Sequence, residues 1–128
     1  MPLTLTVLSA EYSICRLPPG APLPSGLAAL PFWAVTCTPQ ELSLVLPAGY
    51  EPPQSQVEAG WSCLRVEGPL DFALTGILAG LSAALAAAGI SIFALSTFDT
   101  DYLLVRTPRL TAACRALQAD GYRIQSEE

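Results

Sequence analysis

The pattern of hydrophobic and polar positions predicts three strands and one helix between residues 61 and 106. Segments 61–67, 90–98 and 101–106 are rich in β-branched, aromatic and aliphatic residues, which is typical of strands. Residues 73–88 differ, because their apolar side chains recur every three or four positions, as on one face of a helix. The apolar positions of this predicted helix are Leu74, Ile77, Leu78, Leu81 and Leu85.

A second helix is predicted after the third strand. Thr107 and Pro108 supply a capping hydroxyl followed by a proline in the first turn, and Gly121 is placed to end the helix. A short last strand over residues 122–125 completes the order βαββαβ. This order predicts an α+β, ferredoxin-like unit, in which both helices cover one face of an antiparallel sheet.

The first half of the chain repeats the strand pattern of the second half. Segments 32–36 and 41–45 align with later strand segments at an offset of 60 residues, and segment 12–17 does so at an offset of 49 residues. The first connection leaves room only for a short helical turn. We therefore expect a reduced N-terminal unit at residues 1–60 and a complete unit at residues 61–128.

Segment 3–8 also alternates like a strand and precedes segment 12–17 by three residues, which is a hairpin-length connection. Our hypothesis is that it pairs with segment 12–17 and takes the place of the missing last strand of the first unit.

Composition excludes several kinds of chemistry. The chain of 128 residues contains no histidine, and all six basic residues are arginines. Imidazole bases, histidine-bearing zinc sites, Schiff-base lysines and phosphate-binding lysines are therefore excluded. The net charge of −5 argues against a nucleic-acid partner. We expect a protein that is not an enzyme and has no catalytic residue, metal or cofactor; a weaker alternative is catalysis by aspartates or a cysteine.

Residues 72–98 carry no charge and are long enough to cross a bilayer. Small residues between the leucines, followed by Gly89 and a strand pattern, favour helix, turn and strand instead, so no membrane partner is expected. The cysteines are too far apart in sequence for a metal or redox pair, and no leader peptide is visible. We expect four reduced, mostly buried thiols in a cytoplasmic protein.

The run from Thr75 to Ile92, TGILAGLSAALAAAGISI, resembles the core pattern of ACT domains. The following STFDTDYLLV, from Ser96 to Val105, is more specific. It is similar to the short tandem-ACT proteins of bacteria, to the regulatory halves of aspartate kinases and to the cytosolic arginine sensors of animals. The resemblance is carried by residues 61–105, whereas in the first 60 residues the internal repeat alone supports a second copy.

The resemblance implies a site for a small molecule, usually an amino acid, whose occupancy is passed to a partner. The residues implied to form it are Leu74, Thr75, Gly76, Ile77, Thr97, Phe98 and Asp101, with Asp71 and Asp99 nearby. Free N–H groups at a helix start attract a carboxylate, and Gly76 permits close approach. Phe98 offers an apolar or cation–π wall, and the aspartates offer counter-charge. The alternatives are that Asp71 caps the helix, that Asp99 serves the turn and that Asp101 begins an edge strand.

Two functions remain open. The first is a free-standing regulatory module that binds an amino acid and signals through association with another protein or enzyme. The second is a structural or oligomerisation protein that keeps the ACT fold without a ligand. In both cases the resemblance and open sheet edges lead us to expect a homodimer.

Overall fold

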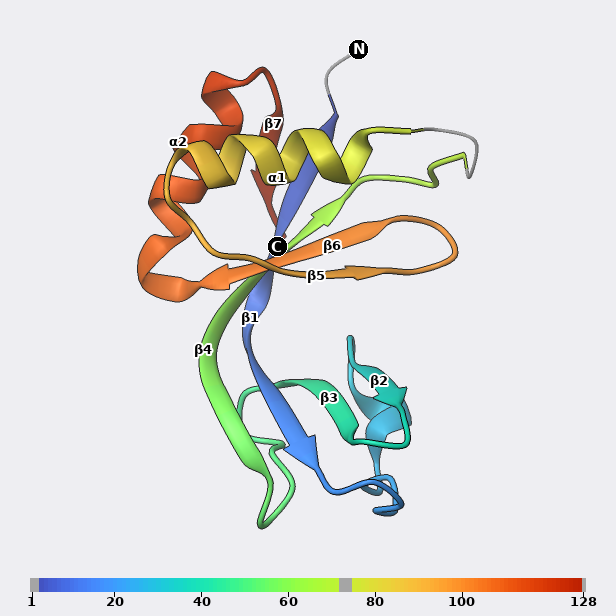
Figure 1. Ribbon diagram of the computed structural model, residues 1–128. Coiled ribbons are helices and arrows are strands. Elements are labelled where there is room, and N and C mark those ends of the chain that lie inside the picture. The colour runs from blue at the N-terminus through green and yellow to red at the C-terminus, as the bar shows by residue number, and fades with distance from the viewer. Residues whose placement is uncertain (1–2, 72–74, 128) are drawn as a thin grey trace. The chain divides into compact units, whose positions relative to one another are not determined.

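The computed structural model describes residues 3–71 and 75–127 (Figure 1). The chain forms two compact units, of which unit 1 comprises Met1–Ser9 with Ser62–Glu128 and unit 2 comprises Ala10–Trp61. Two long strands, β1 (Thr4–Leu17) and β4 (Gln56–Val66), contribute residues to both units. The units are thus interleaved along the chain, in contrast to the consecutive segments 1–60 and 61–128 expected from the sequence.

Unit 1 has an α+β architecture, with strand order β7-β1-β4-β6-β5. After β4 its elements are α1 (Ile77–Ala87), β5 (Phe93–Ser96), β6 (Asp101–Arg106), a 3₁₀ helix (Thr107–Arg109), α2 (Leu110–Ala119) and β7 (Arg123–Ser126). Fully buried leucines of the strands, such as Leu5, Leu64 and Leu103, form one core with Leu81 of α1 and Leu117 of α2. The two helices therefore cover the same face of the sheet.

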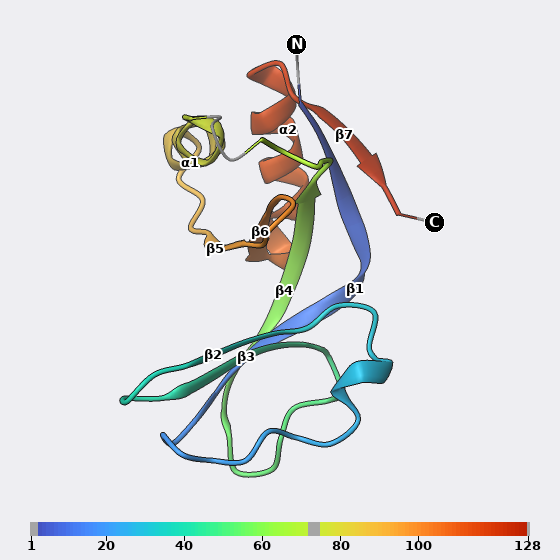
Figure 2. The same ribbon diagram turned by 90° about the vertical axis from the view of Figure 1, so that its right-hand side faces the viewer.

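Segment 3–8 does not form a hairpin with segment 12–17, so that hypothesis is wrong. Both segments belong to the single strand β1, whose first part pairs in parallel with β7, from Thr4 opposite Arg123 to Val7 opposite Ser126. In unit 1, β1 lies between β4 and β7 (Figure 2). The physical reason is local: Ser9, Ala10 and Glu11 include no glycine or proline, so nothing forces a turn and the strand continues.

Unit 2 is built on the second part of β1, with β2 (Ala34–Cys37), β3 (Leu42–Pro47) and a 3₁₀ helix at Leu27–Ala29. Strand β3 pairs antiparallel with both β1 and β2. Every residue of unit 2 is described, and none of them forms an α-helix. Its core consists of Cys15, Leu17, Leu27, Leu42, Leu44 and Leu46.

The β2–β3 and β5–β6 hairpins use the same type of turn. The N–H of Thr38 donates to the carbonyl of Glu41 at 2.9 Å, and the N–H of Thr97 donates to that of Thr100 at 2.8 Å. In each turn the threonine hydroxyl also accepts the N–H three residues later. Thr38 and Thr97 are therefore equivalent, so the hairpins match at an offset one residue shorter than the 60 inferred from sequence.

None of the described helices is long and apolar enough to cross a membrane.

Candidate functional site

A hollow of about 350 Å³ lies in unit 1 between the start of α1 and the β5–β6 turn. The residues that line it are Leu70, Asp71, Gly76, Ile77, Leu78, Ala79, Ser96, Thr97, Phe98, Asp99, Thr100 and Asp101. It has the size of a small-molecule site, for which volumes of roughly 300–1,000 Å³ are usual.

The first wall is the N-terminal end of α1. Gly76 precedes the helix in the left-handed conformation, with φ of 80°, which a side chain would disfavour. The first helical hydrogen bond runs from the N–H of Gly80 to the carbonyl of Gly76 at 2.9 Å. The N–H groups of Ile77, Leu78 and Ala79 precede that bond, so the helix itself provides no acceptor for them. This wall therefore presents hydrogen-bond donors and a positive helix end.

The second wall is the turn at residues 97–100. The hydroxyl of Thr97 donates to the carbonyl of Thr100 at 3.1 Å and accepts the N–H of Thr100 at 3.2 Å. These bonds fix the backbone of the turn while leaving Phe98 79% exposed at the hollow. An aromatic ring is thus available to cover a bound molecule.

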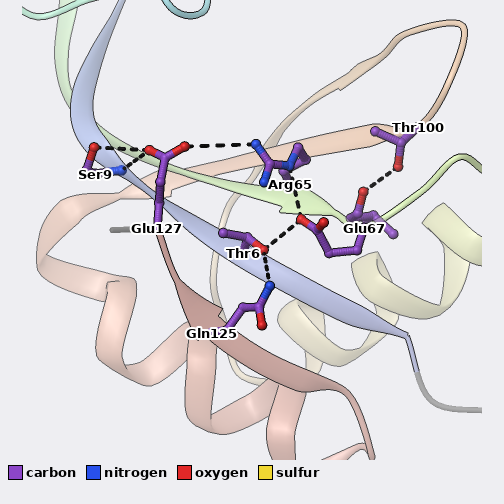
Figure 3. Close-up of polar contacts among 8 residues, drawn as sticks. Thr6, Ser9, Arg65, Glu67, Thr100, Gln125 and Glu127 are labelled. Carbon is purple, nitrogen blue, oxygen red and sulfur yellow. Dashed lines mark hydrogen bonds and ion pairs between the residues drawn. The ribbon is translucent and has the colours of Figure 1, made fainter.

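Two hydrogen bonds fasten this turn to the last residue of β4 and to the segment that follows it. The N–H of Leu70 donates to the carbonyl of Asp99 at 2.7 Å. The buried hydroxyl of Thr100 donates to the carbonyl of Val66 at 2.6 Å (Figure 3). Gly68 lies so close that a Cβ there would be 3.0 Å from the Asp99 carbonyl oxygen. The turn at residues 97–100 is therefore fixed in position relative to the C-terminal end of β4.

Three aspartates give the hollow a negative charge, and none of the described residues lining it is basic. Asp71 and Asp99 are exposed, and Asp101 is half-buried. The hydroxyl of Ser96 donates to Oδ1 of Asp101 at 2.7 Å, which orients that carboxylate. Across the described residues no group of three acidic, cysteine or histidine side chains could hold a metal ion. The arrangement suits an ammonium or guanidinium group.

Seven of the residues predicted from the sequence line this hollow: Asp71, Gly76, Ile77, Thr97, Phe98, Asp99 and Asp101. Thr75 is exposed and does not line it, and Leu74 lies outside the described residues. Helix α1 begins at Ile77 rather than at residue 73, and Gly76 occupies its N-cap, so Asp71 is not the capping residue.

The sequence reasoning missed Leu70, Leu78, Ala79, Ser96 and Thr100. Leu78 and Ala79 complete the first turn of α1, so the true helix start would have revealed them. Ser96 lies opposite Asp101 in the hairpin register, a relationship that follows once the four-residue turn is recognised.

A polar cluster links β1, β4 and the β7 end of unit 1, and its side chains point toward one another (Figure 3). Glu67 accepts hydrogen bonds from the Thr6 hydroxyl at 2.7 Å and from Arg65 at 3.0 Å. These partners, Thr6 first, lower the pKa of Glu67. Glu127 accepts the backbone N–H and the hydroxyl of Ser9 at 2.9 and 3.0 Å, which lowers its pKa too. Gln125 donates to Thr6 at 2.9 Å, so the cluster fastens the inserted strand β1.

Solved structures similar to this chain include a crystal structure of an Agrobacterium tumefaciens protein, with 34% identity and a TM-score of 0.91, covering 100% of this chain and 96% of that one. A Vibrio cholerae protein described as of unknown function, possibly for transport, has 22% identity and a TM-score of 0.70, over 91% of this chain and 88% of that one.

The ligand-free regulatory subunit of aspartate kinase from Thermus thermophilus has 13% identity and a TM-score of 0.59, over 91% of this chain and 97% of that one. At such identities the second and third likenesses establish the fold alone. Among curated proteins no match to the chain is found. The family model described as ACT domain matches residues 56–119, half of the chain. Together with the 34% identical structure, this match shows that the chain belongs to the ACT domain family.

Proposed function

We propose that this protein is a regulatory module that binds an amino acid in the hollow of unit 1 and signals through association with another protein. The observation that carries the proposal is the opposition of two walls, a helix start rich in N–H donors and a turn flanked by aspartates. A zwitterionic amino acid carries the two complementary charges on one small molecule.

The ligand's carboxylate is assigned to the N–H groups at residues 77–79, where the positive end of α1 stabilises an anion. Its ammonium group, or a basic side chain, is assigned to Asp101 with Asp99 nearby. Gly76 leaves room for the ligand backbone, and Phe98 covers the apolar or cationic part of its side chain.

The output is assigned to Phe98, which is 79% exposed beside the hollow. A ligand held between the two walls covers part of this ring and so changes the surface that a partner meets. Phe98 and the edge strand β5 are then the surface through which a partner protein, or a second copy of the chain, senses occupancy.

The experiment is thermal unfolding of the full chain with each of the twenty amino acids at millimolar concentration. One or a few should raise Tm, because a ligand that binds only the folded state stabilises it. Asp101→Asn should abolish the rise for a basic amino acid. Asp120→Asn, the same change at an exposed position after α2, should leave the rise intact.

The second candidate is an ACT protein that acts in assembly without a ligand, which the open edge at β5 favours. An absence of any Tm rise, combined with a stable oligomer in analytical ultracentrifugation, would support it against the sensor.

A further inference from the structure

A second hollow, of about 480 Å³, lies within unit 2 and shares no residue with the one in unit 1. It lies where the connection after β1, residues 21–25, meets the connection after β3, residues 50–53. Leu17, which also belongs to the core of unit 2, lines it from β1. The size again falls within the usual range for small ligands.

The hollow is held in place by β1. Ser13, Cys15 and Leu17 alternate along this strand and point to one face. The hydroxyl of Ser13 donates to Oε2 of Glu51 at 2.6 Å, which fastens the connection after β3 along that face. The N–H of Gly49 donates to both oxygens of Glu51, at 3.0 and 3.2 Å. The position of Glu51 in the wall is therefore determined by three donor contacts.

The walls are stiff and apolar. Four prolines line the hollow, two from each connection: Pro22, Pro24, Pro52 and Pro53. Because proline fixes φ, ordering such walls around a ligand costs little entropy. Leu23 and Tyr50, also in the lining, are 55% and 58% exposed, so large apolar surfaces face solvent here.

Glu51 carries the one formal charge among the lining residues of unit 2, all of which are described. The Ser13 hydroxyl, as the largest cause, lowers the pKa of Glu51, so its carboxylate is ionised at neutral pH. The Ser13 hydroxyl and the N–H groups of Gly49 and Glu51 hold this carboxylate in position, so its negative charge is fixed at the wall of the hollow.

We propose that this hollow binds a small organic amine, with an aromatic or branched aliphatic body between the prolines and a cationic head at Glu51. Charge complementarity decides the class of ligand: the fixed carboxylate attracts a cation and repels an anion, and a neutral molecule gains no such attraction. The Tyr50 ring adds a cation–π or stacking face beside the head group.

The test is titration of the ¹⁵N-labelled full chain with three probes of similar size: phenethylamine, phenethyl alcohol and phenylacetate. Phenethylamine should shift amide signals of residues 21, 23, 25, 50 and 51 in a saturable way, and should bind more tightly than the alcohol, with the carboxylate weakest. No saturable shift, shifts confined to unit 1, or equal affinities of amine and alcohol would overturn the proposal.

Variants separate charge from shape. Glu51→Gln, which keeps an acceptor for Ser13, should weaken phenethylamine binding about tenfold and leave the alcohol unchanged. Tyr50→Ala, at an exposed position, should weaken both probes while the rest of the spectrum stays that of the folded protein. Glu11→Gln, an exposed acid outside the lining, is the matched control and should change neither affinity. Unchanged amine binding by a folded Glu51→Gln variant would also overturn the assignment.

Discussion

The backbone N–H of Leu70 donates a 2.7 Å hydrogen bond to the carbonyl oxygen of Asp99. This bond joins the segment after β4 to the β5–β6 turn at the hollow of unit 1. Both residues line that hollow, so the bond determines its shape without depending on either side chain.

Two glycine substitutions should differ in their cost to stability. A Cβ at Gly68 would lie 3.0 Å from the Asp99 carbonyl oxygen and 3.1 Å from the Leu70 nitrogen, backbone atoms that cannot move independently. Gly68→Ala should therefore lower the free energy of unfolding by about 1–3 kcal/mol.

Gly80→Ala is the contrasting case, measured in the same urea titrations. Its Cβ would meet the Tyr122 hydroxyl at 2.8 Å, the far end of a side chain that can rotate away. Alanine also favours the interior of α1 by about 1 kcal/mol. Stability should stay within about 1 kcal/mol of the wild type, and a larger loss than that of Gly68→Ala would contradict this account.

Ser96→Ala tests the orientation of Asp101. The variant removes the 2.7 Å hydrogen bond to Oδ1 while leaving an exposed position in β5 otherwise unchanged. If the proposed function is correct, calorimetry should show severalfold weaker binding of the amino acid found by thermal unfolding, with an almost unchanged Tm of the free protein. Ala94→Ser, at another exposed position in β5, is the control.

Acid should destabilise the protein through Glu67 and Glu127. Their pKa values are lower in the folded chain than in the unfolded one. Their contribution to stability is thus fully present above the ordinary glutamate pKa of about 4.3 and is lost as pH falls through the lower, folded values. Urea titrations across this range should show the decline.

Thr6→Val should make that decline shallower, because the Thr6 hydroxyl is the largest cause of the lowered pKa of Glu67. Thr36→Val, at an exposed position in β2, should leave the pH dependence unchanged. An identical pH profile for wild type and Thr6→Val would show that another group causes the acid sensitivity.

Thiol reactivity should distinguish the four cysteines, all of which are free. Cys37 is exposed on β2, whereas burial raises the pKa of Cys63 to about 12 and also raises the pKa values of Cys15 and Cys114. A disulfide reagent should react rapidly with one thiol of the folded protein. Cys37→Ser should remove this rapid phase; a rapid phase that persists would place an accessible thiol elsewhere.

Local patterns predicted the elements of unit 1 well where the turn residues are distinctive. Strand β6 spans Asp101–Arg106 as expected, since polar turn residues precede it and Pro108 follows it. The helix start was placed too early, because apolar spacing alone does not reveal that Gly76 adopts the left-handed conformation. Because the helix start was misplaced, the prediction found the site residues of the β5–β6 turn but missed Leu78 and Ala79. These two residues contribute backbone N–H groups rather than side chains.

Long-range pairing was not predictable from these patterns. Alternation over segment 3–8 correctly indicates a strand, but nothing in it distinguishes Tyr12–Leu17 as a neighbour from Arg123–Ser126. Partner choice depends on which edge is free in the assembled sheet. The predicted spacing between the β2–β3 and β5–β6 hairpins was one residue too long, because their apolar positions align almost equally well at offsets of 59 and 60 residues. The matching hydrogen bonds of Thr38 and Thr97 show that the offset is 59.

The insertion of β1 between β4 and β7 also sets an order of events during synthesis. Residues 10–61 of unit 2 leave the ribosome as one continuous segment, so its contacts can form early. The strand at Thr4–Val7 must wait until Arg123–Ser126 has been made before its parallel ladder can close. Contacts so distant in sequence form slowly. One edge of this strand therefore stays open until the end of translation, even after β4 has paired with its other edge, and an open strand edge is a site for unwanted pairing with other chains.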